Sequence, residues 1–378
     1  MTLAYPDKKS LSELLTVPAA ELAPAVPPQA LATDNLLLKG DNQLLLQLLR
    51  QTGALEGKVD LVYIDPPYAT NAVFTLDQPT GTTPARVSTI SRAKQGRVAY
   101  ADTLTGTDFL EFLRERLALL HSLLAPTGSL YLHIDYKIGH YVKVLLDEIF
   151  GAENFRNDIT RIKCNPKNFA RKGYGNVKDM LLFYTKSDQF TWNEPYEDRA
   201  DGEMERLFTK TDVDGRAYTT NPLHAPGETR NGPSGQPWRG ILPPAGRHWR
   251  VSQAKLDELD QAGLIEWSKN DVPRKKIFAE DFTRKRRQDI WKFKDNTSLY
   301  PTQKNLDLLR AIIETSSVPG QTVLDCFAGS GTTLVAAAGL GRRWIGIDQS
   351  PEAINIIRQR LAHEGGLLNP YVFAEAIG

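Results

Sequence analysis

The sequence predicts an α/β fold in which a mostly parallel sheet is covered by helices on both faces and carries an inserted module. Strand-like apolar runs alternate with helical runs in the first and last parts of the chain, a pattern typical of parallel sheets. In between, Gly, Pro, Trp and basic residues become frequent and clean periodicity is rare. We therefore expect one catalytic domain built from residues 35–164 and 298–378, and a separate module at residues 165–297.

The first part of the chain supplies most of the expected sheet. Residues 1–34 are rich in Pro and Ala and predict an N-terminal arm. Residues 59–64 form an apolar, β-branched run that is typical of a buried parallel strand. Strands are expected at residues 36–39, 59–64, 129–134, 158–163 and 180–185, and helices at residues 42–51, 108–124 and 139–150.

The last part of the chain returns to the same alternation. Its predicted elements are helices at residues 303–316, 332–340 and 351–363, and strands at residues 322–326 and 344–348. Within the inserted module only residues 252–262 have a clear helical pattern.

The segment at residues 70–107 is long for a loop in a compact domain. It combines Gly, Thr and Pro with basic residues such as Arg92 and Lys94. Loops of this length are usually functional or disordered. Both a mobile clamp and simple disorder stay open.

The composition is that of an ordinary globular protein, with 378 residues, 41% hydrophobic and 24% charged residues and a net charge of +1. No apolar run approaches the roughly 20 residues needed to span a bilayer. Cys164 and Cys326 form no CxxC pair or metal-binding pattern. We expect a cytoplasmic protein without a metal. Near-neutral net charge still allows one basic face.

The first chemical motif is Asp65-Pro66-Pro67-Tyr68, directly after the strand at residues 59–64. The exocyclic amine of adenine or cytosine is a poor nucleophile, because its lone pair is delocalised into the ring. The Asp65 carboxylate and the Pro66 carbonyl can accept its two hydrogens, and consecutive prolines hold that carbonyl rigidly. Tyr68 offers a stacking face for a base that has left the duplex. The alternative is a simple strand-ending turn.

The second motif joins a strand, a glycine turn and a helix start. Glycines let a ligand approach the backbone, and the helix start offers free N–H donors. The next strand ends at Asp348, where a carboxylate can accept hydrogen bonds from ribose hydroxyls. Neither GxGxxG nor a P-loop lysine is present. The cofactor-binding candidates here are Asp325, Phe327, Ala328, Gly329, Ser330, Gly331, Thr332 and Asp348.

Together these motifs resemble the β class of amino DNA methyltransferases, the N6-adenine and N4-cytosine family, in which the catalytic motif precedes the glycine motif. The resemblance covers roughly residues 34–186 and 298–363. It implies a Rossmann-like sheet of seven strands with S-adenosylmethionine across its carboxyl edge. It also implies that Thr302, Gln303 and Lys304 line the methionine end of the cofactor, and that Asp41 lies near its adenine.

Two positions depart from the family pattern. Asn305 and Cys326 stand where the family commonly has proline. Neither change removes a chemical group, so we expect activity to survive both. Neither cysteine lies in the Pro-Cys setting of cytosine-C5 enzymes, which argues against that chemistry.

The inserted module is predicted to recognise the target sequence, because it interleaves basic and aromatic residues. The alternative for any one basic cluster is a solvated surface. Including the long loop and the residues just before the module, the candidate DNA-binding residues are Arg92, Lys94, Arg161, Lys163, Arg171, Lys172, Trp238, Arg239, Trp249, Arg250, Arg274, Lys275, Lys276, Arg284, Arg286 and Arg287. His133 and Asp135 are equally compatible with a DNA cleft and with a structural role.

We therefore expect a site-specific DNA methyltransferase acting on double-stranded DNA by base flipping, part of or derived from a restriction-modification system. Asp at the head of the catalytic motif favours N6-adenine over N4-cytosine. The alternatives are an N4-cytosine enzyme and a non-catalytic specificity subunit, and methylation of RNA or protein fits Asp65 less well. A cognate restriction endonuclease and a homodimer are the partners that the family suggests.

Overall fold

The computed structural model describes residues 2–16, 18–67, 72–76, 87–89, 97–102, 106–166, 172–229, 231–294, 304–364 and 370–377, without the side chains of residues 72–76, 87–89, 97–102, 201 and 364. Its contacts divide the chain into two units. Unit 1 comprises Met1–Pro195 with Gln288–Gly378, and unit 2 comprises Tyr196–Arg287.

A ten-stranded sheet forms the centre of the described part of unit 1, in the order β1-β21-β2-β20-β19-β3-β7-β9-β8-β18. The six strands from β21 to β7 are parallel to one another. The strands, in spatial order, are β1 (Glu21–Ala23), β21 (Tyr371–Ile377), β2 (Asn35–Lys39), β20 (Arg343–Asp348), β19 (Thr322–Asp325), β3 (Val59–Ile64), β7 (Leu124–Ile134), β9 (Lys178–Thr185), β8 (Phe155–Ile162) and β18 (Ile290–Trp291).

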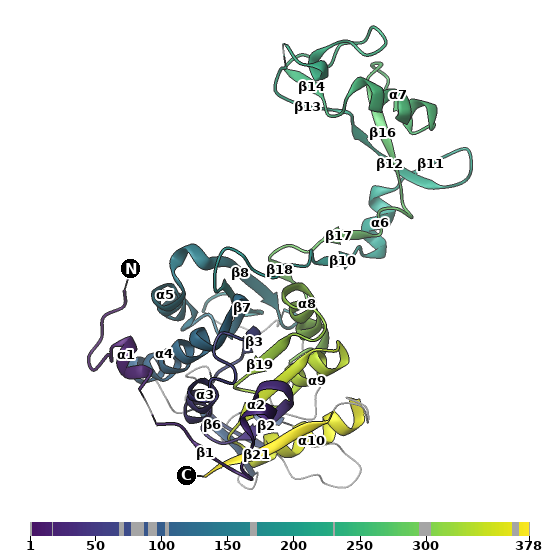
Figure 1. The fold of residues 1–378 in the computed structure, drawn as a ribbon. Coiled ribbons are helices and arrows are strands. Elements are labelled where there is room, and N and C mark those ends of the chain that lie inside the picture. The colour runs from purple at the N-terminus through teal and green to yellow at the C-terminus, as the bar shows by residue number, and fades with distance from the viewer. Residues whose placement is uncertain are drawn as a thin grey trace. The chain divides into compact units, whose positions relative to one another are not determined.

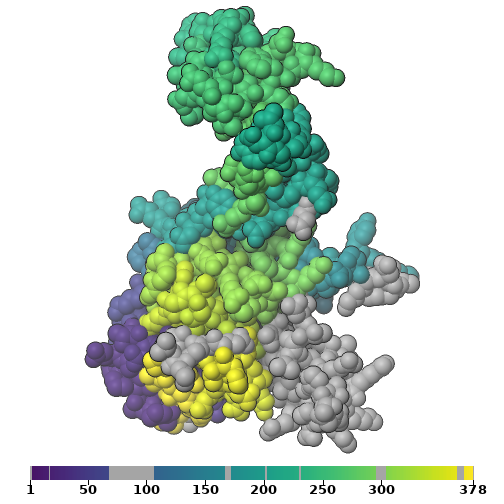
Figure 2. Space-filling model, turned by 90° about the vertical axis from the view of Figure 1, so that its right-hand side faces the viewer, coloured from purple at the N-terminus to yellow at the C-terminus, as the bar shows by residue number. Residues whose placement is uncertain are grey.

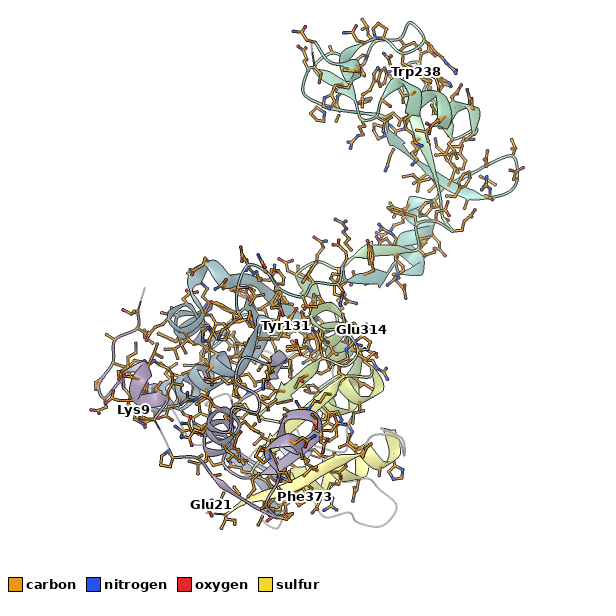
Figure 3. All side chains as sticks on the ribbon, viewed as in Figure 1. Lys9, Glu21, Tyr131, Trp238, Glu314 and Phe373 are labelled. Carbon is orange, nitrogen blue, oxygen red and sulfur yellow. The ribbon has the colours of Figure 1, made fainter. Side chains whose placement is uncertain are left out.

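Helices cover both faces of this sheet (Figure 1). One face packs on α3 (Asn42–Gln51), α4 (Gly106–Leu123) and α5 (Gly139–Phe150), and the other on α8 (Leu306–Ser316), α9 (Thr332–Gly339) and α10 (Pro351–Glu364). Successive strand residues point to opposite faces, so Val62 and Ile64 join the first core whereas Leu61 and Tyr63 join the second. On this second face the hydroxyls of Tyr131 in β7 and Ser316 at the end of α8 form a hydrogen bond at 2.9 Å. Figure 3 labels Tyr131 and, on α8, Glu314.

The prediction of a mostly parallel α/β sheet is confirmed. The seven strands from β2 to β8 are flanked in the structure by β1 and β21 on one side and by β18 on the other. The predicted arm contains α1 (Leu11–Leu14), β1 and α2 (Pro28–Thr33). Because β1 pairs with β21, part of the N-terminal arm lies beside the C-terminal strand, and purple and yellow residues adjoin on the surface (Figure 2).

Within the segment at residues 70–107, the described backbone forms a small antiparallel sheet in the order β5-β4-β6. Its strands are β4 (Ala72–Leu76), β5 (Val87–Thr89) and β6 (Arg97–Asp102). Arg92 and Lys94 lie outside the described residues.

Unit 2 consists of small antiparallel sheets and short helices. Its core contains Leu223, Trp238, Trp249, Leu256 and Leu259. The elements are β10 (Tyr196–Asp198), α6 (Asp201–Leu207), β11 (Lys210–Thr211), β12 (Ala217–Pro222), β13 (His224–Pro226), η2 (Pro233–Gly235), β14 (Arg247–Trp249), α7 (Gln253–Gln261), β15 (Ile265–Trp267), β16 (Pro273–Phe278) and β17 (Arg284–Arg286). Unit 2 is shorter than the module predicted at residues 165–297, because β9 and β18 are strands of the large sheet.

No helix among the residues that the structure describes is long and apolar enough to cross a membrane.

Candidate active site

The carboxyl ends of four neighbouring parallel strands meet at one edge of the large sheet. The strands β2, β20, β19 and β3 lie side by side and run in the same direction. Asp65 follows β3, Asp325 ends β19, Asp348 ends β20, and Asp41 lies two residues beyond β2. The two sequence motifs therefore lie on one edge, where sites in parallel sheets form.

Asp325 is the most deeply buried of these carboxylates, with 2% of its surface exposed. The Thr333 hydroxyl donates to its Oδ2 at 2.6 Å, and the Phe327 amide donates to its Oδ1 at 3.0 Å. Burial raises the pKa of Asp325 to about 7; the charges of Asp65 and Asp348 add to the rise, and the two hydrogen bonds oppose it. A cationic ligand would favour the ionised form. Asp325 therefore fits a cofactor that carries an ammonium group.

Asp348 fixes the glycine turn. Its Oδ2 accepts a hydrogen bond from the Gly329 amide at 2.8 Å, and its Oδ1 accepts one from the Ser350 amide at 2.8 Å. Gly329 has a φ of +51°, which side chains rarely adopt. Burial raises the pKa of Asp348. The carboxylate thus holds the turn that follows β19 against the end of β20.

Gly331 serves the packing of two helices. Its φ is +75°, and a Cβ at this position would lie 2.8 Å from Cγ1 of Ile357 in α10. The hydroxyls of Ser330 and Thr332 contact each other at 3.2 Å, and Arg360 donates to Thr332 Oγ1 at 3.0 Å. These two predicted cofactor contacts are therefore engaged within the fold.

Ala328 and Phe327, the two remaining residues of the turn, also contact other parts of unit 1. Ala328 is buried, and its amide donates to the Ile347 carbonyl at 3.1 Å. Phe327 is half-buried, with its ring centroid 6.1 Å from that of Phe112.

Asp41 caps the helix α3. Its Oδ1 accepts hydrogen bonds from the amides of Gln43 and Leu44 at 2.8 and 3.1 Å. Its Oδ2 lies 3.3 Å from Nη2 of Arg116. The neighbouring Asn42 donates to the carbonyl of Cys326 at 2.8 Å. Asp41 therefore lies at the predicted edge, where its carboxylate organises α3.

Asp65 forms an ion pair with Lys304, in which Nζ lies 2.8 Å from Oδ2. Both side chains are largely shielded from solvent. Lys304 is placed by the start of α8, which Asn305 caps by accepting hydrogen bonds from two backbone amides. The capping role explains how asparagine replaces the proline of the family pattern here. Pro66 is buried and Pro67 half-buried, whereas Tyr68, Thr302 and Gln303 lie outside the described residues.

A buried polar network extends from Tyr63 next to Asp65. The Tyr63 hydroxyl contacts His133 Nδ1 at 2.9 Å, and His133 Nε2 contacts Asp179 Oδ2 at 3.1 Å. Arg161 Nη1 lies 3.4 Å from the same oxygen, and Lys163 Nζ lies 2.5 Å from Asp179 Oδ1. His133 and Arg161 have no exposed surface. The network therefore joins β3, β7, β9 and β8 behind the candidate catalytic carboxylate.

Burial and neighbouring charges together shift the pKa values of the groups in this network. Burial and the positive charge of Lys304 lower the pKa of His133, and the hydrogen bond to Asp179 opposes this shift. The pKa of Asp179 is lowered despite its burial, because His133, Lys304 and Lys163 stabilise the carboxylate. Asp135 is buried, and its Oδ1 accepts a hydrogen bond from the Lys137 amide at 3.0 Å. The geometry therefore supports a structural role for His133 and Asp135, one of the two roles left open by the sequence.

Sequence reasoning did not identify Tyr63 or Asp179 as partners. Asp179 is a charge at the start of an otherwise apolar run, which is the one signal that could have singled it out. Its buried partner Arg161 was instead predicted to contact DNA.

Four of the other predicted DNA-binding side chains have a partner within the protein. Two are buried in the core of unit 2, and two form an ion pair with an aspartate. Trp238 and Trp249 are 2% and 1% exposed and belong to the core of unit 2. Lys163 pairs with Asp179, and Lys276 Nζ lies 3.0 Å from Asp212 Oδ1.

Further predicted DNA contacts form surface ion pairs. Arg239 pairs with Asp257 and Asp260, Arg284 with Asp198, and Arg287 with Glu197. Lys172, Arg250, Arg274 and Lys275 have no ion pair with any carboxylate that the structure describes. Arg171 lies outside the described residues.

Neither described cysteine is poised as a nucleophile. Cys326 is buried, and burial raises the pKa of its thiol, which disfavours the reactive thiolate. Cys164 is half-buried and free. No group of three or more His, Cys, Asp or Glu side chains in the described part of the chain is arranged to hold a metal ion.

Comparison with known proteins agrees with this geometry. A family model described as DNA methylase matches residues 59–359. The type II methyltransferase M.EcaI of Enterobacter cloacae is 37% identical over 98% of this chain and 80% of that protein. M.KpnI, a type II methyltransferase of Klebsiella pneumoniae, is 26% identical over 82% of this chain and 78% of that protein. The Mod subunit of the type III restriction-modification enzyme StyLTI of Salmonella typhimurium is 26% identical over 81% of this chain and 50% of that protein.

Proposed function

The chain belongs to the DNA methylase family, and from that membership we propose that it methylates the exocyclic amino nitrogen of adenine in duplex DNA. It is an enzyme that uses S-adenosylmethionine, and the base specificity and the residue roles below are the proposal. The observation that carries it is the common edge of Asp65 and Asp325, which follow or end the neighbouring parallel strands β3 and β19.

Asp65 and Pro66 orient the amine. The Asp65 carboxylate accepts one amine hydrogen and the Pro66 carbonyl accepts the other, which turns the nitrogen lone pair away from the ring. Pro67 fixes the backbone after that carbonyl. Tyr68 stacks on the base after it has left the duplex. The rate arises mainly from positioning two reactants against each other, without a covalent enzyme intermediate.

Lys304 holds the Asp65 carboxylate in place. A charge-assisted hydrogen bond fixes one oxygen of Asp65. In this proposal the carboxylate held in this way faces the amine. The network of His133 and Asp179 fixes the ends of the neighbouring strands on the same face of the sheet.

The cofactor residues are those gathered around Asp325. S-adenosylmethionine supplies an electrophilic methyl group on a sulfonium. Asp325 suits its ammonium group, because the buried carboxylate lies near two further negative charges. Asp348 and the turn at residues 327–332 suit the ribose, and Asp41 the adenine. Lys304, with Thr302 and Gln303, suits the methionine end.

N6-adenine is favoured over N4-cytosine by the aspartate at the head of the catalytic motif. Either base offers a similar amine to Asp65, so N4-cytosine is the second candidate. Membership of a restriction-modification system is supported by the Mod subunit to which the chain is similar. A partner endonuclease and a homodimer follow from the family resemblance.

The test is to methylate DNA with the full chain and digest the product to nucleosides for mass spectrometry. The parent should yield N6-methyl-2′-deoxyadenosine, and Asp65→Ala should yield none above background. Asp188→Ala, an exposed position in unit 1, should match the parent. Undiminished methylation by Asp65→Ala would overturn the mechanism, and methyl groups on cytosine N4 would overturn the choice of base.

A further inference from the structure

Most basic groups on unit 2 lie next to carboxylates. Arg239 contacts Asp257 and Asp260, and Lys285 Nζ lies 2.9 Å from Glu203 Oε2. Such pairs leave little positive potential for a polyanion, since each positive charge has a nearby negative one. Their presence shows that basic composition alone does not identify a DNA-binding face.

A different set of basic side chains converges without an acidic partner. We name His224, Arg247, Arg250 and Arg274 the basic cluster. Nη1 of Arg247 lies 3.3 Å from Nδ1 of His224, and Nε of Arg250 donates to the His224 carbonyl at 3.0 Å. Among the residues that the structure describes, no carboxylate forms an ion pair with any member of the cluster.

The backbone of unit 2 places these side chains together. β13 and β14 pair so that His224 faces Trp249 and Pro226 faces Arg247 (Figure 1). Pro222 of the adjoining strand β12 pairs with Arg274 of β16. Because these are strand pairings, the cluster is set by the fold.

Hydrogen bonds also hold the guanidinium groups in place. Nε and Nη2 of Arg274 donate to Oγ1 and the carbonyl of Thr220, both at 2.8 Å. An arginine has five N–H donors in a planar fork, so each guanidinium retains donors for a ligand. Arg247 and Arg250 are exposed, and His224 and Arg274 are half-buried.

The positive charges of the basic cluster favour the binding of an anion. The pKa of His224 is lowered, first by burial and then by the positive charges of Arg247, Arg250 and Arg274. Three arginine charges therefore act on one imidazole ring. Their mutual repulsion is relieved when a phosphate lies between them, and arginine forks match phosphate oxygens in pairs.

We propose that the basic cluster binds the phosphate backbone of duplex DNA, whereas the carboxylate-paired Arg239 and Lys285 do not contribute to that binding. The proposal rests on the proposed function, because it takes DNA as the substrate. It assigns phosphate contact to Arg250 and Arg274 and adds His224 and Arg247 to the interface.

The test compares the salt dependence of duplex binding by the full chain and its variants. Arg247→Gln and Arg250→Gln remove exposed charges, and Arg239→Gln removes a paired charge from the same unit. Each cluster variant should lower the slope of log affinity against log salt by about 1 and weaken binding to all sequences alike. Arg239→Gln should leave the slope unchanged. Equal slopes in the parent and in the Arg247→Gln, Arg250→Gln double variant would overturn the proposal, as would an equal loss in Arg239→Gln.

Two further measurements separate this proposal from the proposed function. Calorimetric binding of S-adenosylmethionine should be unchanged in the double variant, because the proposed cofactor residues lie in unit 1 and the substitutions in unit 2. At saturating DNA the double variant should keep the parent kcat while its KM for DNA rises. A parent that methylates no DNA would overturn the proposed function, whereas parental KM in the double variant overturns only the phosphate site. Equal retention of duplex RNA through the same residues would contradict the commitment to DNA.

Discussion

Nζ of Lys304 lies 2.8 Å from Oδ2 of Asp65, and this pair joins the segment before α8 to the carboxyl end of β3. Lys304 stands in the segment proposed to bind the cofactor, and Asp65 in the motif proposed to hold the base. On these proposed roles, the ion pair links the two binding sites through one carboxylate.

Lys304→Met should reduce single-turnover methylation by about ten- to hundredfold, the equivalent of the roughly 1.5–3 kcal/mol typical of hydrogen bonds to charged groups. The cause is a less fixed Asp65 carboxylate. Rapid-quench assays measure the effect. Lys58→Met, at the opposite end of β3, is the control, because the Lys58 ammonium contacts only backbone carbonyls in the described structure. An unchanged rate in Lys304→Met would show that the pair is incidental.

Asp325 should make the unfolding free energy depend on pH. Its pKa is 3.8 in the unfolded reference and about 7 in the fold. Between these values the folded chain holds more protons, so this group contributes stability that is lost as pH rises, by roughly 1.4 kcal/mol per pH unit. Urea unfolding from pH 4.5 to 8 should show a flatter profile for Asp325→Asn than for the parent. Asp188→Asn should retain the parental profile.

Binding of S-adenosylmethionine should release protons near pH 6.5. A cation beside Asp325 favours the carboxylate, so the cofactor lowers the pKa of that group and affinity rises with pH up to about 7. Asp348, whose pKa burial also raises, adds to the release. Calorimetry in two buffers of different ionisation enthalpy counts the protons. Asp325→Asn should reduce the count, and equal counts would contradict a cationic contact at Asp325.

Gly331→Ala should destabilise the fold more than Gly320→Ala. Both glycines have positive φ, but only at Gly331 would a Cβ collide with Ile357. The backbone strain should cost about 1–3 kcal/mol at either position, and overpacking should add about 1–3 kcal/mol at Gly331 alone. Chemical denaturation measures both. Equal losses would show that α9 and α10 relax without cost.

Asp179→Asn should lower the unfolding free energy by about 3–5 kcal/mol, because it removes a buried carboxylate charge that contacts Arg161 and Lys163. The introduced amide oxygen can still accept a hydrogen bond from His133. The decrease in unfolding free energy therefore measures the effect of the lost negative charge. Asp158→Asn, exposed on the adjoining strand β8, should change stability by less than about 0.5 kcal/mol. If Asp179→Asn also changed the unfolding free energy by less than about 0.5 kcal/mol, the buried charges would be stabilised by water and not by Asp179.

The common edge of Asp65, Asp325 and Asp348 could be predicted from sequence because each carboxylate follows or ends a β-branched or apolar run. Strands of that kind lie parallel inside an α/β sheet, so their carboxyl ends meet whatever the distance along the chain. The outer strands β1 and β18 and the strand β21 next to β1 were not predicted, since each is short or partly polar and depends on its neighbour.

The partners of the basic residues could not be predicted from sequence. Arg161 and Arg250 are the same residue type in similar composition, yet one is buried against Asp179 and the other is exposed beside His224. Tryptophans such as Trp238 have the same ambiguity, because an aromatic side chain suits a core as well as a base. Only the three-dimensional pairing separates these cases.

The segments by which the chain enters and leaves unit 2 run beside each other, as Tyr196 pairs with Arg286 in β10 and β17. A continuous stretch whose two junctions are adjacent in space behaves as a cassette. It can be exchanged by recombination at two nearby joints, while the sheet that carries Asp65 and Asp325 stays whole. If unit 2 reads the target sequence as predicted, its exchange would change the target and leave the proposed chemistry of unit 1 in place.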